Sequence, residues 1–137
     1  MSRRIVLLMV PAVVAAVGFA VGAASRADPK AGPRLAHMVF FSLKDGTKAA
    51  RKALVASAWK HLGGIGGVAH FSVGTIAEGV VEPVSVRDFD VALHVIFEDK
   101  EARDAYLKDP RHDAFVAEGK DSWSKVRVFD SFLHEKP

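Results

Sequence analysis

Two side chains in the C-terminal half of the chain are suited to acid–base chemistry on a small molecule. Tyr106 lies at the end of a helical pattern, and His112 follows an Asp109-Pro110 pair that can start a second helix. The positive end of a helix favours a neutral imidazole, whereas Asp109 and Asp113 favour the protonated form. A neutral His112 could act as a general base, and the hydroxyl of Tyr106 could donate to a developing oxyanion.

Each of these residues also has a purely structural interpretation. His112 could satisfy backbone groups at a junction between helices, and Tyr106 could be a half-buried core residue. His37 lies in an apolar strand, where a histidine is either a hydrogen-bonded core residue or part of a pocket. If the face that carries His37 meets the helices, we expect a pocket shared with His112. Its ligand-binding wall would be His37 with six further residues: Val39, Phe41, Val91, Leu93, Phe115 and Trp123.

Other kinds of site find little support in the sequence. The chain has no cysteine, and its remaining histidines show neither metal-ligand spacing nor a carboxylate–histidine cluster, so we predict no metal. No serine stands in a G-x-S-x-G motif. The glycines of 63–67 follow a helix rather than a strand, which is the wrong order for a phosphate-binding loop. We therefore predict no cofactor.

The elements that must position the candidate residues alternate between strand and helix patterns. The alternation of apolar residues is clearest at Phe89–Phe97, and the strand at 36–43 is apolar on both faces. The full prediction, in chain order, is a strand over 36–43, a helix over 48–62, a strand over 68–76, a loop over 77–87, a strand over 89–97, a helix ending at 107, a helix from 110 to about 124 and a strand over 125–133.

This order predicts an α+β fold, a ferredoxin-like βαββαβ antiparallel sheet with helices on one face. The other face would then be bare. Met38 and Phe40 on the first strand, and Phe129 on the last, make that face apolar. Because a contiguous apolar face usually marks an interface, we expect two sheets to pack together as a homodimeric α/β barrel.

The first 27 residues form a leader that does not belong to the domain. Met1–Arg4 is basic, and the uncharged run Ile5–Ser25 ends at Arg26. This pattern is typical of a secretory signal peptide, although the run is long enough for an uncleaved membrane anchor, and Arg3-Arg4 also resembles a twin-arginine export signal. We expect an exported protein, periplasmic or extracellular, or a membrane-anchored one if the leader is retained. Residues 28–34 read as a linker and 35–137 as the domain.

The leader also accounts for the positive charge of the chain. The net charge is +3, from 19 basic and 16 acidic residues, and three of the basic residues are Arg3, Arg4 and Arg26. The domain is therefore neutral overall. Nucleic-acid binding requires a basic patch on the domain itself, so we expect no nucleic-acid partner. Contact with a membrane is expected only through an uncleaved leader.

Three segments of the chain resemble the stress-responsive α/β-barrel (Dabb) family. They are His37–Gly46 (HMVFFSLKDG), the run from Tyr106 to His112 (YLKDPRH) and the terminal Val128-Phe129-Asp130. The resemblance extends from Leu35 to Leu133, nearly the whole domain. It implies the dimeric ferredoxin-like barrel that the element order also predicts.

The resemblance further implies three hypotheses about function. A plant branch of the family cyclises polyketide chains by an aldol reaction, and its catalytic histidine and tyrosine fall on His112 and Tyr106. A strand histidine of those enzymes falls on His37, whereas another pocket histidine is replaced by Val91. The main hypothesis is binding of a small apolar ligand; the alternatives are a cofactor-free cyclase-like lyase and a structural or stress-protective oligomer without a ligand.

Overall fold

The computed structural model describes residues 32–134. Its elements are β1 (Leu35–Leu43), α1 (Lys48–Leu62), β2 (Val68–Thr75), β3 (Val91–Phe97), α2 (Lys100–Tyr106), α3 (Pro110–Gly119), the 3-10 turn η1 (Lys120–Ser122) and β4 (Trp123–Phe132). The predicted leader at 1–27 and most of the predicted linker lie outside the described residues. Within 32–134, none of the helices has both the length and the apolar character needed to cross a membrane.

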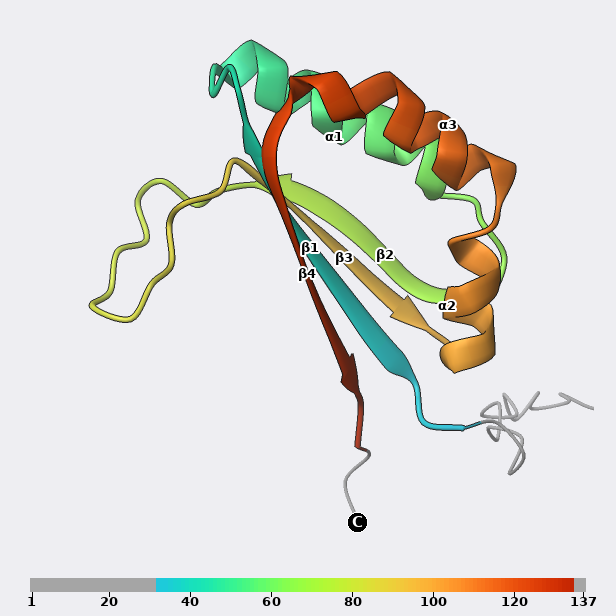
Figure 1. The fold of residues 1–137 in the computed structure, drawn as a ribbon. Coiled ribbons are helices and arrows are strands. Elements are labelled where there is room, and N and C mark those ends of the chain that lie inside the picture. Colours follow the sequence, from blue (N-terminus) through green and yellow to red (C-terminus); the bar gives the residue numbers. More distant parts are fainter. Residues whose placement is uncertain (1–31, 135–137) are drawn as a thin grey trace, which may run out of the picture.

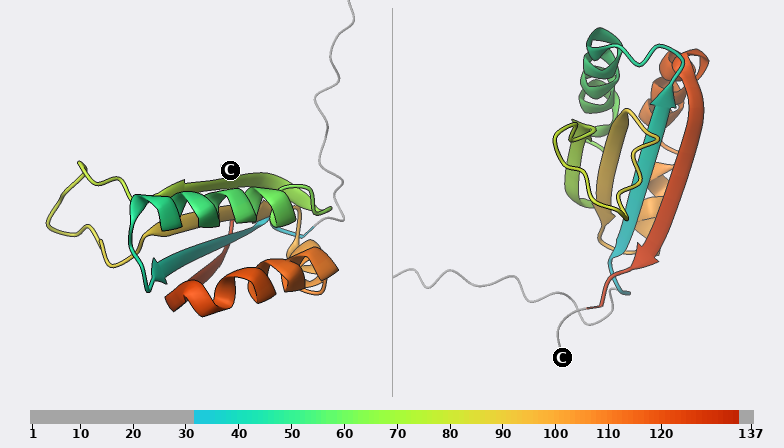
Figure 2. Two further views of the ribbon diagram at one scale, coloured as in Figure 1. Left: turned by 90° about the horizontal axis from the view of Figure 1, so that it is seen from above. Right: turned by 90° about the vertical axis from the view of Figure 1, so that its left-hand side faces the viewer.

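The four strands form one antiparallel sheet in the order β2-β3-β1-β4. Helices α1 and α3 lie side by side over one face of this sheet, and α2 lies at its end (Figures 1 and 2). This arrangement confirms the predicted ferredoxin-like fold. The first strand to be made, β1, therefore ends up in the interior of the sheet, between β3 and the last strand.

The core lies between the sheet and the helices. On β3, Val91, Leu93, Val95 and Phe97 are all buried, as the alternating pattern predicts. From the helical side, Leu54, Ala58 and Leu62 of α1 complete the core, at the spacing of one helical face. Burial of this apolar surface is the main stabilising contribution, at about 25 cal/mol per Å².

Side-chain caps explain where the three helices begin. The Thr47 side chain accepts a hydrogen bond from the backbone N–H of Ala50, and Asp99 accepts one from Ala102. Asp109 accepts from the N–H of Arg111, so that α3 begins at the proline as predicted. This cap fixes the orientation of the first turn of α3, which carries His112.

The C-terminal helix is shorter than the pattern predicts. We expected it to reach about residue 124, but α3 ends at Gly119, and Trp123 is the first residue of β4. The hydroxyl of Ser122 donates to the carbonyl of Gly119 at 2.7 Å, which stabilises the turn between them. A Cβ on residue 119 would lie 2.5 Å from the Trp123 ring, so only glycine lets this ring pack against the helix end.

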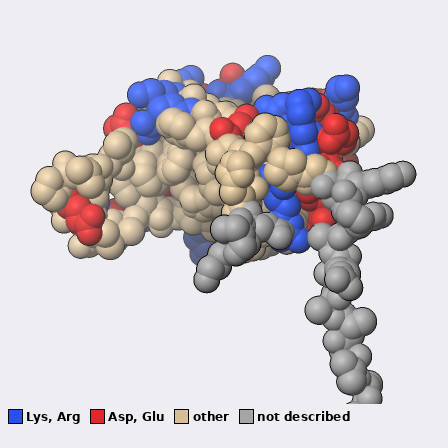
Figure 3. Space-filling model, turned by 90° about the horizontal axis from the view of Figure 1, so that it is seen from below, with Lys and Arg blue, Asp and Glu red and all other residues tan. Residues whose placement is uncertain are grey.

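The sheet face opposite the helices carries a cluster of aromatic rings. Phe40 makes edge contacts with Phe89 at 5.0 Å, with Phe129 at 5.8 Å and with His94 at 6.2 Å between ring centroids. Phe129 is 55% exposed. Seen from this side, the surface is mostly uncharged over the sheet, and charges gather towards its edges (Figure 3). The expected apolar face is therefore present and uncovered in the single chain.

Candidate functional site

A cavity of about 440 Å³ lies between the sheet and helices α2 and α3. Most of its wall is apolar. It includes five of the residues that we expected there, Val39, Phe41, Leu93, Phe115 and Trp123, together with Leu62, Leu107, Val116, Val126 and Val128. Its polar groups come from five residues: His37, Arg103, Tyr106, His112 and Asp130. The cavity thus combines an apolar wall with acid–base groups.

His37 is held by a carboxylate on the neighbouring strand. Its side chain is buried, with 5% of the residue exposed, and Nδ1 lies 2.6 Å from Oδ1 of Asp130. The two residues face each other directly in the β1–β4 pairing. The other oxygen of Asp130 accepts a hydrogen bond from Arg103 at 3.2 Å. Because a carboxylate can only accept, Nδ1 of His37 is the nitrogen that carries the proton of this hydrogen bond, and Asp130 fixes the orientation of the ring.

Tyr106 lies between the two histidines. Its ring meets that of His112 edge-on at 5.3 Å and that of His37 at 6.4 Å between centroids. The residue is only 1% exposed, and burial raises the pKa of its phenol above the usual 10.0. Within residues 32–134, the hydroxyl makes no hydrogen bond. Tyr106 therefore stays protonated and keeps its donor free for a ligand.

His112 is half-buried and has a lowered pKa. Burial is the largest cause, since it disfavours the charged ring; the nearby Asp113 acts against it, and His37 adds to the lowering. Lowering the pKa below 6.5 keeps the imidazole neutral at pH 7, as a general base requires. Both predicted catalytic residues, His112 and Tyr106, thus stand in one cavity with His37.

Residues 35–133 match the family model of the stress responsive A/B barrel domain, Dabb. The chain belongs to the Dabb family. Its sequence matches no curated protein. Among solved structures, a Dabb protein with a ferredoxin-like fold from Mesorhizobium loti is 25% identical, with a TM-score of 0.63 over 76% of this chain and 100% of that one.

Two further solved structures share the fold of this Dabb domain. A dimeric ferredoxin-like protein of unknown function from Thermobifida fusca is 16% identical, with a TM-score of 0.62 over 74% of this chain and 92% of that one. The hydroxynitrile lyase of Passiflora edulis is 17% identical, with a TM-score of 0.61 over 76% of this chain and 96% of that one. These likenesses show the fold, and the Thermobifida fusca protein is itself described as dimeric.

Two polar residues of the Dabb site were missing from the sequence-based prediction. Asp130 and Arg103 lie far from His37 along the chain, Asp130 by 93 residues, and only strand register and helix placement bring them together. The fold creates a carboxylate–histidine pair, His37 with Asp130, that the sequence pattern did not reveal. The only available signal was the V-F-D segment, which we used for the family resemblance and not for the site.

Val91 is the one predicted wall residue that the structure does not bring to the cavity. It pairs with Phe41 and Thr75 near the end of the sheet, and its side chain is completely covered by the core. No surface of Val91 is left for a ligand. A pocket histidine of the plant enzymes falls on position 91, and in this Dabb domain that position holds a core valine.

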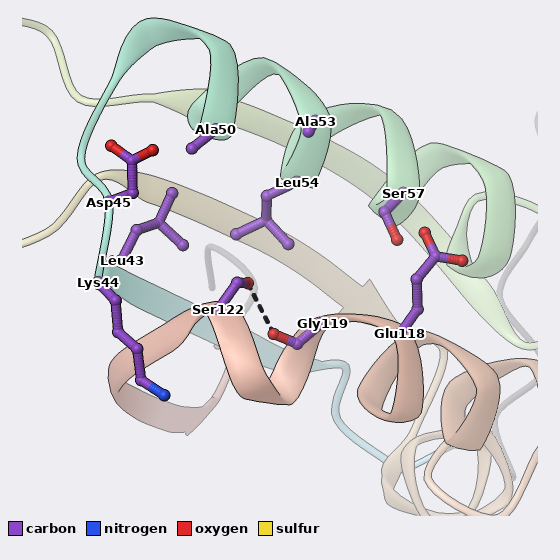
Figure 4. Close-up of a pocket in the computed structure, with 10 residues that line it drawn as sticks. All are labelled: Leu43, Lys44, Asp45, Ala50, Ala53, Leu54, Ser57, Glu118, Gly119 and Ser122. Carbon is purple, nitrogen blue, oxygen red and sulfur yellow. Dashed lines mark hydrogen bonds between the residues drawn. The ribbon is translucent and has the colours of Figure 1, made fainter.

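A second hollow of this Dabb domain lies between α1 and α3, away from the histidine site. Small residues, including Ala53, Ser57 and Gly119, line it, and Glu118 stands at its side (Figure 4). Glu118 is bound by His61 at 2.7 Å and by Lys60 at 2.9 Å. Hydrogen bonds from these two side chains, that of His61 first, lower the pKa of Glu118 to about 2. Glu118 is thus committed to linking the helices.

The described part of this Dabb chain offers no group of three or more histidine or carboxylate side chains arranged to hold a metal ion. The two carboxylate–histidine pairs, at His37 and at His61, are separate and each is engaged with arginine or lysine.

Replacing Asp130 with alanine is expected to destabilise this Dabb domain by about 1–2 kcal/mol. The change removes the partner of the buried His37 Nδ1–H and of one Arg103 N–H. This value is at the lower end of the range for a hydrogen bond to a charged group, because the Asp130 side chain is 36% exposed and solvent screens its charge. Urea unfolding measures the change. Asp121→Ala is the control, since Asp121 is exposed; equal losses for both variants would contradict a structural role for the pair.

Proposed function

We propose that this Dabb protein is an exported homodimer that binds a small, largely apolar molecule between its sheet and helices. The observation that carries the proposal is a single cavity with an apolar wall and a polar end formed by His37, Tyr106 and His112. Its volume, about 440 Å³, falls in the range of about 300–1,000 Å³ for ligand sites. A compound with an apolar body and one carbonyl or hydroxyl group would match the apolar wall and the polar end of the cavity.

The dimeric part of the proposal rests on the apolar sheet face. Phe40, Phe89 and Phe129 would be buried if two such faces packed together. Other proteins with this fold, including the one from Thermobifida fusca, are described as dimeric, which supports the same assembly for this chain. Export rests on the sequence pattern of residues 1–27.

A second candidate function is a cofactor-free lyase or cyclase at the same site. It is favoured by the contact between Tyr106, whose phenol stays protonated, and His112, whose imidazole stays neutral. His112 would take a proton from the carbon beside a carbonyl. Tyr106 would donate a hydrogen bond to the resulting enolate oxygen. The enolate carbon would attack a second carbonyl of the same molecule, and the new alkoxide would take up the proton.

A purely structural or stress-protective oligomer is the least supported of the three hypotheses. It requires no ligand site, and a packed core normally leaves few voids larger than a water molecule. The cavity of this domain is far larger than that and is lined by residues from six elements. Keeping such a volume open costs stability, which favours a use for it.

A thermal-shift screen of the expected mature chain, residues 28–137, tests ligand binding. The probes are small aromatic carbonyl compounds, polyketide-like compounds and an aromatic cyanohydrin. We expect a binder present at about 100 times its Kd to stabilise the protein by about 2.7 kcal/mol, raising Tm by about 10 °C or more for a domain of this size.

A variant that fills the cavity controls the screen. Val128 lines the cavity at its open side, so Val128→Trp should abolish the shift, whereas Ala56→Trp on the exposed face of α1 should keep it. His112→Ala, run beside them, shows whether the histidine contributes to affinity. Absence of any shift, or an equal shift in Val128→Trp, would argue against a ligand in this cavity.

A further inference from the structure

The segment from 77 to 90, between β2 and β3, displays apolar side chains to solvent. We call it the valine arm. Val80, Val81, Val84 and Val86 are 59%, 70%, 85% and 64% exposed. Figure 1 shows the arm projecting from one end of the sheet, beyond the two helices. A cluster of four exposed valines on one loop is unusual, since loops of soluble domains are normally polar at their tips.

The arm is held in shape by polar bonds on its inner side. The guanidinium of Arg87 donates to three backbone carbonyls of the arm, those of Ala77 at 3.2 Å, of Glu78 at 3.0 Å and of Val80. The N–H of Ser85 donates to the carbonyl of Glu82 at 2.9 Å, which closes the turn at the tip. Arg87 therefore ties the backbone of the arm together, while the four valines remain exposed.

The base of the arm is also fixed to the domain. Arg51 of α1 bridges Glu78 at 2.6 Å and Asp90 at 2.9 Å. The N–H of Ile76 donates to the carbonyl of Asp90 at 3.0 Å, so the two ends of the arm are paired. Ordering a loop of this length costs conformational entropy. In a single chain the exposed valines contribute nothing that offsets this cost. Burial of the valines against a partner would offset it.

The arm continues the apolar face of the sheet. Val86 lines one hollow, of about 270 Å³, together with Phe40, Phe89 and Phe129. The charged side chains beside this hollow are paired, since Asp88 binds Arg127 at 2.6 Å and Lys125 at 3.3 Å. Through Val86, the apolar surface of the sheet face continues onto the arm.

We propose that the valine arm clasps a second copy of this chain and extends the dimer interface beyond the sheet. The inference rests on the homodimer of the proposed function and adds the surface that secures it. A second copy fits better than a membrane surface, because Val86 joins the arm to the apolar sheet face, and the arm's single cation, Arg87, is engaged by the arm's own backbone carbonyls. Membrane-binding segments instead rely on lysine and arginine.

Sedimentation equilibrium of residues 28–137 tests the clasp with a double variant, Val81→Asp with Val84→Asp. We expect its dimer Kd to rise at least about tenfold, since two charges would be placed in an apolar contact. The matched control puts the same charges on the exposed face of α1, as Ala49→Asp with Ala56→Asp, and should keep the wild-type Kd. An unchanged Kd in the arm variant overturns the clasp and leaves the dimer standing; a monomeric wild type overturns both.

A fluorescent probe on the arm gives a second test that does not depend on a destabilising change. Since the chain has no cysteine, Val84→Cys provides one attachment point for an environment-sensitive dye. We expect the emission to shift to the blue as the protein is concentrated through its dimer Kd. A dye at Ala56→Cys should not respond. A dye at position 84 that stays water-exposed in a dimeric sample would overturn the proposal.

Discussion

Replacing His112 with alanine is expected to lower kcat by about 10²–10⁴-fold, the usual contribution of a general base. The substrate is the compound that the thermal-shift screen identifies as a binder. The aromatic cyanohydrin is tried first, and the polyketide-like compounds follow. The ring of His112 lies 5.3 Å from that of Tyr106 and lines the same cavity as His37. Loss of the imidazole removes the proton acceptor but little of the apolar wall, so binding should persist.

The pH profile separates a base from a merely structural histidine. A general base acts in its neutral form, and burial lowers the pKa of His112 below 6.5. The acidic limb of kcat/KM should therefore have its midpoint below 6.5, and activity should be lost as the pH falls through that midpoint. His134→Ala, a change at an exposed C-terminal histidine, is the control. Full turnover by His112→Ala would refute the catalytic role.

Replacing Tyr106 with phenylalanine is expected to lower kcat by about 10²–10³-fold while leaving stability unchanged or slightly raised. The ring keeps its contacts with Phe97 and His112. The hydroxyl has no hydrogen-bond partner among the described residues, so its removal breaks nothing in the free protein. A loss of turnover without a loss of stability would identify the hydroxyl as a donor to the reacting oxygen.

The state of this hydroxyl can be measured directly, because Tyr106 is the only tyrosine in the chain. Burial raises the pKa of its phenol, so the folded protein should show little phenolate absorbance at pH 10, where an exposed tyrosine is half ionised. Unfolding in urea at the same pH should bring the absorbance up. Phenolate in the folded protein at pH 10 would mean that water reaches the hydroxyl freely, which would weaken its role as an oxyanion donor.

Local patterns predicted the fold because they are set by near neighbours along the chain. The alternation at Phe89–Phe97 identified β3 and its buried face, and Asp109 with Pro110 identified the start of α3 and the place of His112. The end of α3 was missed because Trp123 begins β4 and packs its ring against Phe41 of β1, a contact between residues far apart in the sequence.

The site residues that were predicted are those whose side-chain chemistry can be recognised from the sequence by itself. His37, Tyr106 and His112 are conspicuous by chemistry, whereas Asp130 and Arg103 are ordinary surface types until the fold places them at the cavity. Their roles depend on which residue of β4 faces which residue of β1. A shift of one residue in that register would turn Asp130 to the opposite face and leave His37 unpaired.

The central place of β1 has a consequence for how the domain is made. Strand β1 lies between β3 and β4, and its His37 pairs with Asp130, 93 residues later. A nascent chain thus carries the first half of its site long before the ribosome has made the second. The sheet cannot close until the last strand has left the exit tunnel, and contacts this distant in sequence form slowly. The acid–base centre is accordingly completed late, and a chain lacking its final strand would have no carboxylate to hold His37.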